Sequence, residues 1–387
     1  MSRKNTRLHG LDTLRAAAIV LVFMYHYMVF VSGEPTFGWG STVGWAGVDL
    51  FFVLSGYLIA DQLFAGLAAR RELSLRAFYA RRLLRTLPDY YVVLALYFLF
   101  PAAMGGKTPP PLWQFLSFTQ NILLHPGTAF SHAWSLCIEE QFYLLLPLAL
   151  VIGARWRGSV RHAWLALIGL MLAAIALRSM LWLQYAAADE RSSDWYYRYI
   201  YYASWCRCDE FLPGVALALI KHFHAPLWMR VLGWGNRLLA AGALAVALMF
   251  YLGATRYYVD GAGYPYFMTG FGYTLLAASF ALLLLAALAP GSLLQRVRVP
   301  GAAPLAAWSY AIYLSHKPLA HVLHQPLHQL GIAGFNEVLV IAAACVLAGW
   351  LLHRCVETPF MRWRARRWPD NFPAAAPAAA PALQPGM

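Results

Sequence analysis

The feature that most constrains this chain is a series of apolar runs, each roughly 20 residues long, that repeats along almost its whole length. Hydrophobic residues make up 60% of the 387 residues and charged residues only 12%, whereas soluble domains carry about 25% charged residues. Runs of this length cross a bilayer as helices. We therefore predict an all-α polytopic membrane protein with about ten transmembrane helices in one bundle. The predicted spans are 12–31, 45–66, 89–104, 132–153, 163–184, 204–220, 236–253, 267–289, 304–323 and 335–353.

Basic residues are unevenly divided between alternate connections. The net charge of +13 raises the question of nucleic-acid binding. However, most Lys and Arg fall in one set of connections, including the cluster at 70–85 and the stretch from Arg354 onward, and few fall in the other, among them Lys107 and Arg256. This asymmetry is typical of the positive-inside rule. We predict that both termini are cytoplasmic and that nucleic acid is not a partner.

The end of the chain differs in composition from the rest. Residues 368–387 are rich in Pro and Ala, a composition typical of disorder, so we predict a transmembrane domain over 1–367 and a disordered cytoplasmic tail after it. The spacing of Cys206 and Cys208 is unusual for zinc ligands, and no metal site is predicted.

Two basic residues lie within the first span, in LDTLRAAAIVLVFMYH. Arg15 and His26 are eleven residues apart, which on an α-helix leaves them about 20° apart around the axis and about 16 Å apart along it. Ionisable residues inside membrane segments are costly and usually functional. We interpret the pair as two ends of one polar track, with Arg15 near the cytoplasm and His26 toward the outer leaflet.

Other polar groups fall at the depth of His26 in four further spans. His132, Ser135 and Glu139 share one helical face because they are spaced i, i+3 and i+7. We expect these groups to converge in one layer. The members are Asp49, His132, Ser135, Glu139, Arg207, Asp209, His316 and Lys317.

A second basic group, Arg81, Arg82 and Arg85, comes just before the third predicted span. Arginine binds phosphate through two parallel hydrogen bonds, and Arg82 and Arg85 lie one turn apart on a helix. Together with Arg15 they are candidates for holding a phosphate-bearing ligand. The alternative is a topology signal or a contact with anionic lipid.

Several segments resemble, in order, the acyltransferase 3 family of integral membrane acyltransferases. The resemblance covers roughly residues 7 to 360. One landmark is an arginine followed after ten residues by a histidine, met here by Arg15 and His26. The others are GVDLFFVLSGYLI (47–59), RRLLR (81–85), HAWSLCIEEQFYLLLP (132–147), RCDEFLPG (207–214), SYAIYLSHKPL (309–319) and VETPF (356–360).

The resemblance implies transfer of an acyl group, commonly acetyl, from cytoplasmic acyl-CoA to a hydroxyl of a glycan or another acceptor, in a bacterial cytoplasmic membrane. Arg15, Arg82 and Arg85 would contact the CoA phosphates and His26 would have the central chemical role. Lys317 departs from the pattern, because an aromatic residue is expected after His316. That departure concerns the acceptor side.

Acyl transfer to an alcohol needs a base, and histidine suits this role. We expect His26 to remove the acceptor proton while Asp49 or Glu139 orients its ring, and Arg207 or Lys317 to stabilise the oxyanion. The structural alternative for the two carboxylates is a buried ion pair with Arg207 or Arg178.

The acceptor side allows several interpretations. The residues expected to bind the acceptor are His132, Trp134, Ser135, Arg207, Asp209, His316 and Lys317. For Trp134 and Ser135 the alternative is packing of helix against helix, and an acyl-serine route through Ser135 is a further alternative. The aromatic stretches 195–205 and 256–273 either bind sugar or form an interfacial belt; we favour the belt.

Other function classes stay open. A transporter or flippase would also carry intramembrane Arg, His and Asp, although internal repeats typical of that class are not evident. A non-catalytic sensor of acyl-CoA or glycan would not need a base on the track. Acceptor identity, including a macrolide-type small molecule, and homo-oligomerisation cannot be read from the sequence.

Overall fold

The computed structural model describes residues 8–155, 159–186, 193–259 and 263–372. This part of the chain is helical, and its only strand-like pairing is an isolated bridge between Val259 and Gly263. The long helices are α1 (His9–Tyr27), α3 (Ala46–Ala68), α4 (Leu75–Leu99), α6 (Trp134–Arg155), α7 (Val160–Tyr185), α10 (Leu212–Phe223), α12 (Asn236–Arg256), α13 (Tyr273–Leu288), α15 (Ala302–Gln329), α16 (Phe335–Leu352) and α17 (Thr358–Arg367). The short helices are α2 (Trp39–Val43), α5 (Leu112–Leu116), α8 (Asp194–Tyr196), α9 (Ser204–Arg207), α11 (Ala225–Leu232) and α14 (Leu293–Arg296).

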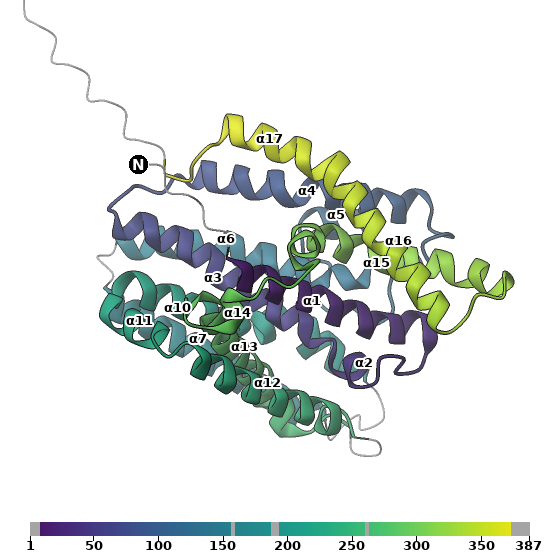
Figure 1. Ribbon diagram of the computed structural model, residues 1–387, viewed down its shortest axis with the longest axis horizontal. Helices are drawn as coiled ribbons and strands as arrows, with labels where there is room; N and C mark the ends of the chain where they lie inside the picture. Colours follow the sequence, from purple (N-terminus) through teal and green to yellow (C-terminus); the bar gives the residue numbers. More distant parts are fainter. Residues whose placement is uncertain (1–7, 156–158, 187–192, 260–262, 373–387) are drawn as a thin grey trace, which may run out of the picture.

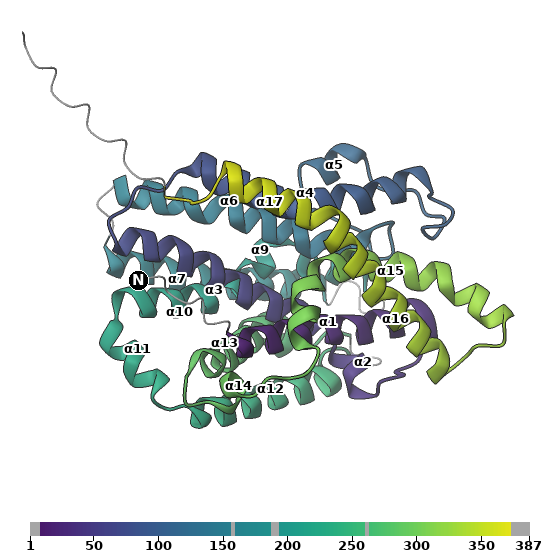
Figure 2. The ribbon, with the colours of Figure 1, turned by 45° about the horizontal axis from the view of Figure 1, so that its top comes forward.

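The fold is a bundle with α1 near its middle (Figure 1). Helix α1 packs against α3, α13 and α15, while α4 and α17 lie side by side along one edge. Helices α15 and α16 form a hairpin that projects at one end of the bundle (Figure 2). Among the described residues, seven helices are long and apolar enough to cross a membrane. This confirms the predicted class, a polytopic all-α membrane protein.

Helices α3 and α10 pack closely because glycine removes the side chains between them. A Cβ on Gly56 would lie 2.1 Å from the carbonyl oxygen of Phe211, and one on Gly214 would lie 2.2 Å from that of Val53. Small residues allow such close backbone contact in membrane helices. The contact fixes the start of α10, and with it the polar residues that precede it, against α3.

Two predicted spans differ from the helices found. The span predicted at 89–104 belongs to α4, which begins at Leu75 and ends at Leu99. Ser74 caps the helix by accepting from the Ala77 backbone N–H, and arginine favours helix, so the helix extends into the basic stretch. Consequently Arg81, Arg82 and Arg85 lie on the helix itself.

The span predicted at 204–220 is interrupted. Its first part is α9 followed by a 3₁₀ turn over Cys208–Phe211, and α10 begins only at Leu212 with Pro213 in its first turn. Proline favours the start of a helix over its interior. In a 3₁₀ turn, residues three apart lie almost directly above one another, which places Arg207 beside Glu210.

The segment after α17 is ordered where the sequence predicts the start of a disordered tail. Residues 368–372, here called the C-terminal strap, pack on the α3–α4 connection: Arg71 binds Asp370 at 2.5 Å, and the Ser74 N–H donates to the Asn371 carbonyl at 3.0 Å. Phe372 is buried. Polar anchors and one buried ring override the disorder suggested by composition. Residues 373–387 of the predicted tail lie outside the described part.

Candidate functional site

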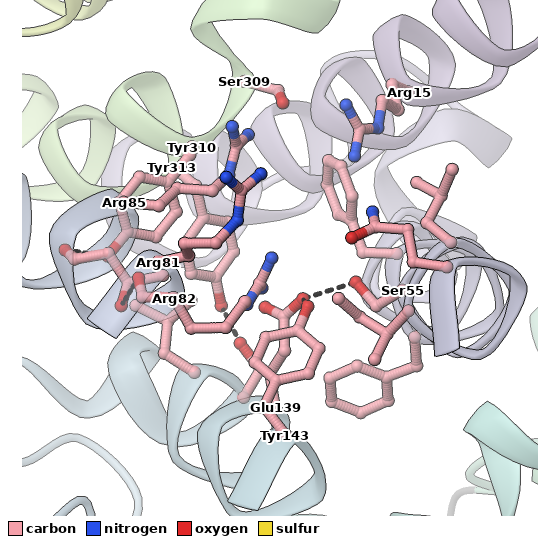
Figure 3. A pocket seen from close by; sticks show the side chains of 18 of the residues that line it. Arg15, Ser55, Arg81, Arg82, Arg85, Glu139, Tyr143, Ser309, Tyr310 and Tyr313 are labelled. Carbon is pink, nitrogen blue, oxygen red and sulfur yellow. Dashed lines mark hydrogen bonds between the residues drawn. The ribbon is translucent and has the colours of Figure 1, made fainter. Parts of the chain in front are cut away.

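A cavity of about 360 Å³ opens between α1, α3, α4, α6, α15 and α17 (Figure 3). Its charged lining residues are five arginines and one carboxylate, Glu139. Apolar side chains such as Val48 and Phe52 line another part of it. A strongly cationic cavity with an apolar section suits a ligand that has phosphates at one end and a less polar arm. The arginines are Arg15, Arg81, Arg82, Arg85 and Arg364.

Neighbouring groups hold three of the five arginines in place. The Arg82 guanidinium lies 3.7 Å from the ring centre of Tyr143, Arg81 donates to the Trp368 carbonyl in the strap, and Arg85 is 3.8 Å from Glu357. In the described part of the chain, Nε of Arg82 and Nε of Arg364 are buried without a hydrogen-bond partner. Buried unpaired donors are rare. These two belong to residues that line the cavity, where a bound ligand could provide acceptor oxygens.

The Glu139 carboxylate lies close to the Arg82 guanidinium at the wall of the cavity (Figure 3). Its carboxylate accepts hydrogen bonds from the hydroxyls of Ser55 and Tyr143. Tyr143 lies four residues after Glu139, on the same helical face, a signal that the sequence contained but that we did not use. Arg364 had no such signal, because its place depends on α17 folding back beside α4.

A second hollow of about 490 Å³ adjoins the first and shares Arg15 and Arg85 with it. Asp12, His353 and Arg362 are among its other lining residues. Binding sites for small molecules commonly occupy several hundred Å³. The two adjoining hollows therefore offer room for a ligand that is larger than the first cavity alone.

Three histidines lie together next to the part of the cavity that is lined by Ser135 and Tyr313. Nδ1 of His26 is 2.7 Å from Nε2 of His316, and the rings are stacked with centres 4.9 Å apart. The His132 ring centre is 5.5 Å from that of His316 and 6.3 Å from that of His26. The structure thus brings together His26, His132 and His316 from three helical segments, three of the residues that were expected to converge in one layer.

The hydrogen bonds assign the tautomers of this cluster when the rings are neutral. Nδ1 of His316 lies 2.8 Å from the Tyr313 carbonyl and 3.1 Å from the Ile312 carbonyl, so this nitrogen must carry the proton. Its Nε2 is then an acceptor, and the proton of the contact with His26 belongs to Nδ1 of His26. Nε2 of His26 is left with a free lone pair, the form of imidazole that accepts a proton.

Two hydroxyls separate the cavity from the histidines. Ser135 and Tyr313 both line the cavity, and their oxygens are 2.6 Å apart. Tyr313 donates to the His132 carbonyl at 2.6 Å, so Ser135 donates to Tyr313. His26 is not among the residues that line the cavity. Tyr313 connects the cavity to the histidines, because its ring centre lies 5.9 Å from that of His132 and 5.8 Å from that of His316.

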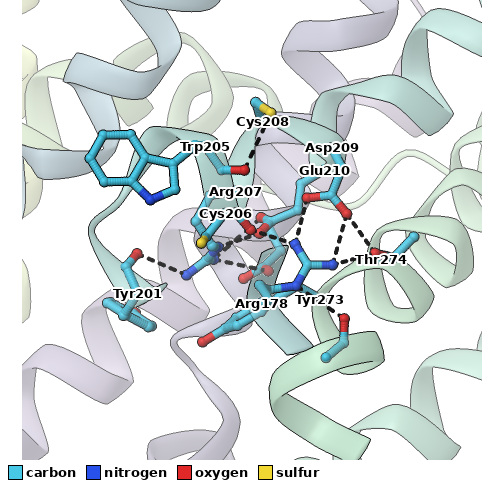
Figure 4. A network of polar contacts seen from close by, with 12 residues as sticks. Arg178, Tyr201, Trp205, Cys206, Arg207, Cys208, Asp209, Glu210, Tyr273 and Thr274 are labelled. Atoms are coloured by element: carbon cyan, nitrogen blue, oxygen red, sulfur yellow. Dashed lines mark hydrogen bonds and ion pairs between the residues drawn. The ribbon is translucent and has the colours of Figure 1, made fainter. Parts of the chain in front are cut away.

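Arg207 and Asp209 lie in a fully buried ion-pair network (Figure 4). Asp49, also fully buried, joins it through Arg207. Arg178 donates to Asp209 from both terminal guanidinium nitrogens, Nη1 and Nη2, at 2.8 and 3.0 Å. Arg207 binds Asp49 at 3.1 Å and also Glu210. Buried charges must be paired in this way. The geometry matches the structural alternative for Asp49, whose carboxylate is bonded to Arg207 and not to His26.

The remaining sequence candidates also have defined partners. Lys317 donates to the Ser131 hydroxyl at 3.0 Å and lies 4.1 Å from the ring centre of Phe30. Trp134 packs with its ring 5.1 Å from the Arg207 guanidinium. Neither Asp49 nor Glu139 bonds to His26 among the described residues; His316 occupies that place. The close approach of His316 was not foreseeable, since it joins residues 290 positions apart.

Comparison with known proteins gives the geometry a context. The Bacillus subtilis protein YrhL, named as a candidate peptidoglycan O-acetyltransferase, is 29% identical over 90% of this chain and 54% of its own length. The peptidoglycan O-acetyltransferase OatA of Listeria monocytogenes is 29% identical over 56% of this chain and 34% of its own. The O-acetyltransferase OatA of Staphylococcus aureus is 35% identical over 37% of this chain and 24% of its own length.

The chain thus spans about half or less of the length of these relatives. No solved structure matches it. Residues 8–354, from the start of α1 to beyond the end of α16, match the acyltransferase domain of the acyltransferase 3 family, so the chain belongs to that family.

Proposed function

We propose that this protein is a membrane O-acetyltransferase that transfers acetyl from cytoplasmic acetyl-CoA to a hydroxyl of a cell-wall or surface glycan. The observation that carries the proposal is the arginine-lined cavity that ends, through the Ser135–Tyr313 pair, at the histidine cluster. The names of the relatives support the choice of acetyl and glycan.

In this proposal the cavity is the binding site for acetyl-CoA, the acetyl donor. The phosphates of CoA match the five guanidinium groups, and Nε of Arg82 and Arg364 would gain the acceptors that they lack. Arginine is well suited to this role because its donors form a planar fork. The apolar section near Phe52 would receive the pantetheine arm, so that the thioester points toward Ser135 and Tyr313.

His26 supplies the base of the proposal. Its Nε2 takes the proton of the acceptor hydroxyl, the oxygen attacks the thioester carbonyl, and the C–S bond breaks when the tetrahedral intermediate collapses. The departing sulfur receives the proton from His26, giving CoA thiol and an acetyl ester. His316 acts as a positioning residue, because its Nε2 fixes the His26 ring by accepting from Nδ1.

A hollow lined by aromatic residues is the acceptor site of the proposal. Its volume is about 350 Å³, and Trp45, Tyr197, Tyr257 and Tyr264 are among its lining residues. Tyr25 also lines it, and the Tyr25 ring centre lies 5.6 Å from that of His26. Aromatic faces with hydroxyl groups suit a sugar ring, so this arrangement favours sugar binding over a purely interfacial belt.

The experiment uses the full chain in proteoliposomes with radiolabelled acetyl-CoA and peptidoglycan fragments. We expect label in an alkali-labile ester on the glycan, and loss of that label in His26→Ala. His125→Ala is the matched control, since His125 is an exposed residue paired with Asp194. Full transfer by His26→Ala would refute the role of His26. Passage of glycan across the membrane without consumption of acetyl-CoA would refute the enzyme and favour the flippase.

A further inference from the structure

The hairpin of α15 and α16 carries a cluster of metal-binding side chains away from the cavity. His324 and His328 lie one turn apart near the end of α15, and Glu337 lies in the first turn of α16. Residues four apart on a helix present their side chains on the same face. The two imidazoles therefore face the carboxylate across the hairpin.

The three side chains converge. Nδ1 of His324 is 2.6 Å from one carboxylate oxygen of Glu337, and Nε2 of His328 is 3.7 Å from the other. The three donor atoms all lie within 4.8 Å of one another. The Glu337 side chain is 6% exposed, whereas those of His324 and His328 are 37% and 55% exposed. The carboxylate thus forms the floor of a site whose other side opens outward.

We propose that His324, His328 and Glu337 form a binding site for a divalent transition metal ion, with zinc as the best fit. Two imidazoles and one carboxylate form a ligand set that suits zinc, with ligand distances of about 2.0–2.2 Å, and a fourth position is left for water. Imidazole ligands favour zinc over magnesium or calcium, which prefer oxygen. The exposed imidazoles have room to make the small rotations that coordination requires.

A simple His–Glu hydrogen bond would not account for the whole cluster. It explains the 2.6 Å contact of His324. The 3.7 Å separation between His328 and the second oxygen is too long for a hydrogen bond. A cation between the three donors would engage both oxygens and both rings.

A bound ion would brace the part of the fold that carries His316. The site lies eight residues beyond His316 on α15. Next to it, Tyr27, Leu327, Val338 and Ile341 form a small buried cluster that joins α1 to the hairpin. Tyr27 directly follows His26. The ion would therefore tie α15 to α16 next to the buried cluster that contacts α1.

The test is zinc binding by the full chain in detergent micelles, after purification through a tag that contains no histidine. After dialysis against EDTA and then titration with zinc chloride, we expect one zinc ion per chain by calorimetry. His324→Ala and His328→Ala should each weaken binding by at least about tenfold, since even loss of an outer-sphere partner has an effect of that size. His321→Ala, on the same helix but outside the cluster, is the matched control and should bind as the native protein does.

Two further measurements keep the proposal open to refutation. Zinc should raise the thermal unfolding temperature of the native protein and of His321→Ala, but not of the double variant His324→Ala, His328→Ala. Cobalt chloride should give the intense visible bands of a low-symmetry site only where both histidines are present. Equal zinc stoichiometry and affinity in the native and double-variant proteins, or no zinc bound by folded native protein, would overturn the proposal.

Discussion

The Arg178–Asp209 pair allows a decisive test of whether a buried charge serves folding or substrate binding. Asp209→Ala removes the carboxylate that accepts from both terminal nitrogens of Arg178, at 2.8 and 3.0 Å, and from the hydroxyl of Thr274. Arg178 is fully buried, so water cannot replace the lost partner. Breaking one partner of a buried pair destabilises by about 3–5 kcal/mol, and we expect a loss of that size.

The assay is unfolding in mixed micelles of mild detergent and SDS, followed by tryptophan fluorescence. Asp194→Ala is the matched control, because Asp194 pairs with Arg198 at 3.4 Å and both side chains are partly exposed. An exposed pair contributes about 0–1 kcal/mol, so the control should unfold close to the native protein. Removing both charges, in Arg178→Met with Asp209→Leu, should destabilise less than Asp209→Ala alone, since no uncompensated charge then stays buried.

The refuting result is equally specific. If Asp209→Ala unfolds at the same SDS fraction as Asp194→Ala but has lost acetyl transfer, Asp209 acts on substrate and the structural interpretation of the network is wrong. If the double variant Arg178→Met, Asp209→Leu is the least stable of the three proteins, the ion pair itself stabilises the fold. The penalty of one uncompensated buried charge would then not explain the loss in Asp209→Ala.

Further predictions concern the cavity, the helix contact and the histidine pair. Arg82→Lys should raise the KM for acetyl-CoA about tenfold with unchanged membrane topology, because lysine keeps the charge but loses the planar fork. Kinetics measure the KM and cysteine accessibility measures the topology. An unchanged KM would contradict the proposed acetyl-CoA site. Gly56→Ala should destabilise by about 1–3 kcal/mol because its Cβ would meet the Phe211 carbonyl, whereas Gly153→Ala, with open space around it, should not; equal SDS unfolding curves for the two would refute the close contact. His316→Leu should lower kcat for transfer about 100-fold, the lower end of the contribution of general acid–base catalysis, and alter its pH profile while KM for acetyl-CoA stays unchanged; an unchanged kcat would remove His316 from the mechanism.

Features encoded locally could be predicted from the sequence. The apolar runs predicted the membrane class, and the order of short motifs predicted the family; both are confirmed. The spacing of Arg15 and His26 placed them on one helix, and both lie on α1. The first and the last of these predictions depend on periodicity within a segment, whereas the family prediction depends on short motifs that resemble those of a known family.

Features that depend on packing between distant segments could not be predicted. The start of α4 is an exception, because it is set locally by the Ser74 cap, which the apolar run beginning near residue 89 does not mark. The choice between function and ion pairing for Asp49 needed the position of Arg207, 158 residues away. Likewise, the contact between His26 and His316 follows from how α15 packs on α1, which no local pattern specifies.

Gly66 gives experimental access to the C-terminal strap. The Phe372 ring occupies the space that a Cβ on Gly66 would need, with its Cζ only 2.0 Å from that position. A single methyl group there would displace the Phe372 ring from its buried position. Asn371, the preceding residue, lines the arginine cavity, and Arg81 donates to the Trp368 carbonyl in the same strap. The substitution would therefore loosen one wall of the cavity and one anchor of Arg81 while all five arginines are kept. Gly66→Ala thus tests the contribution of this short segment to ligand retention without removing any charge.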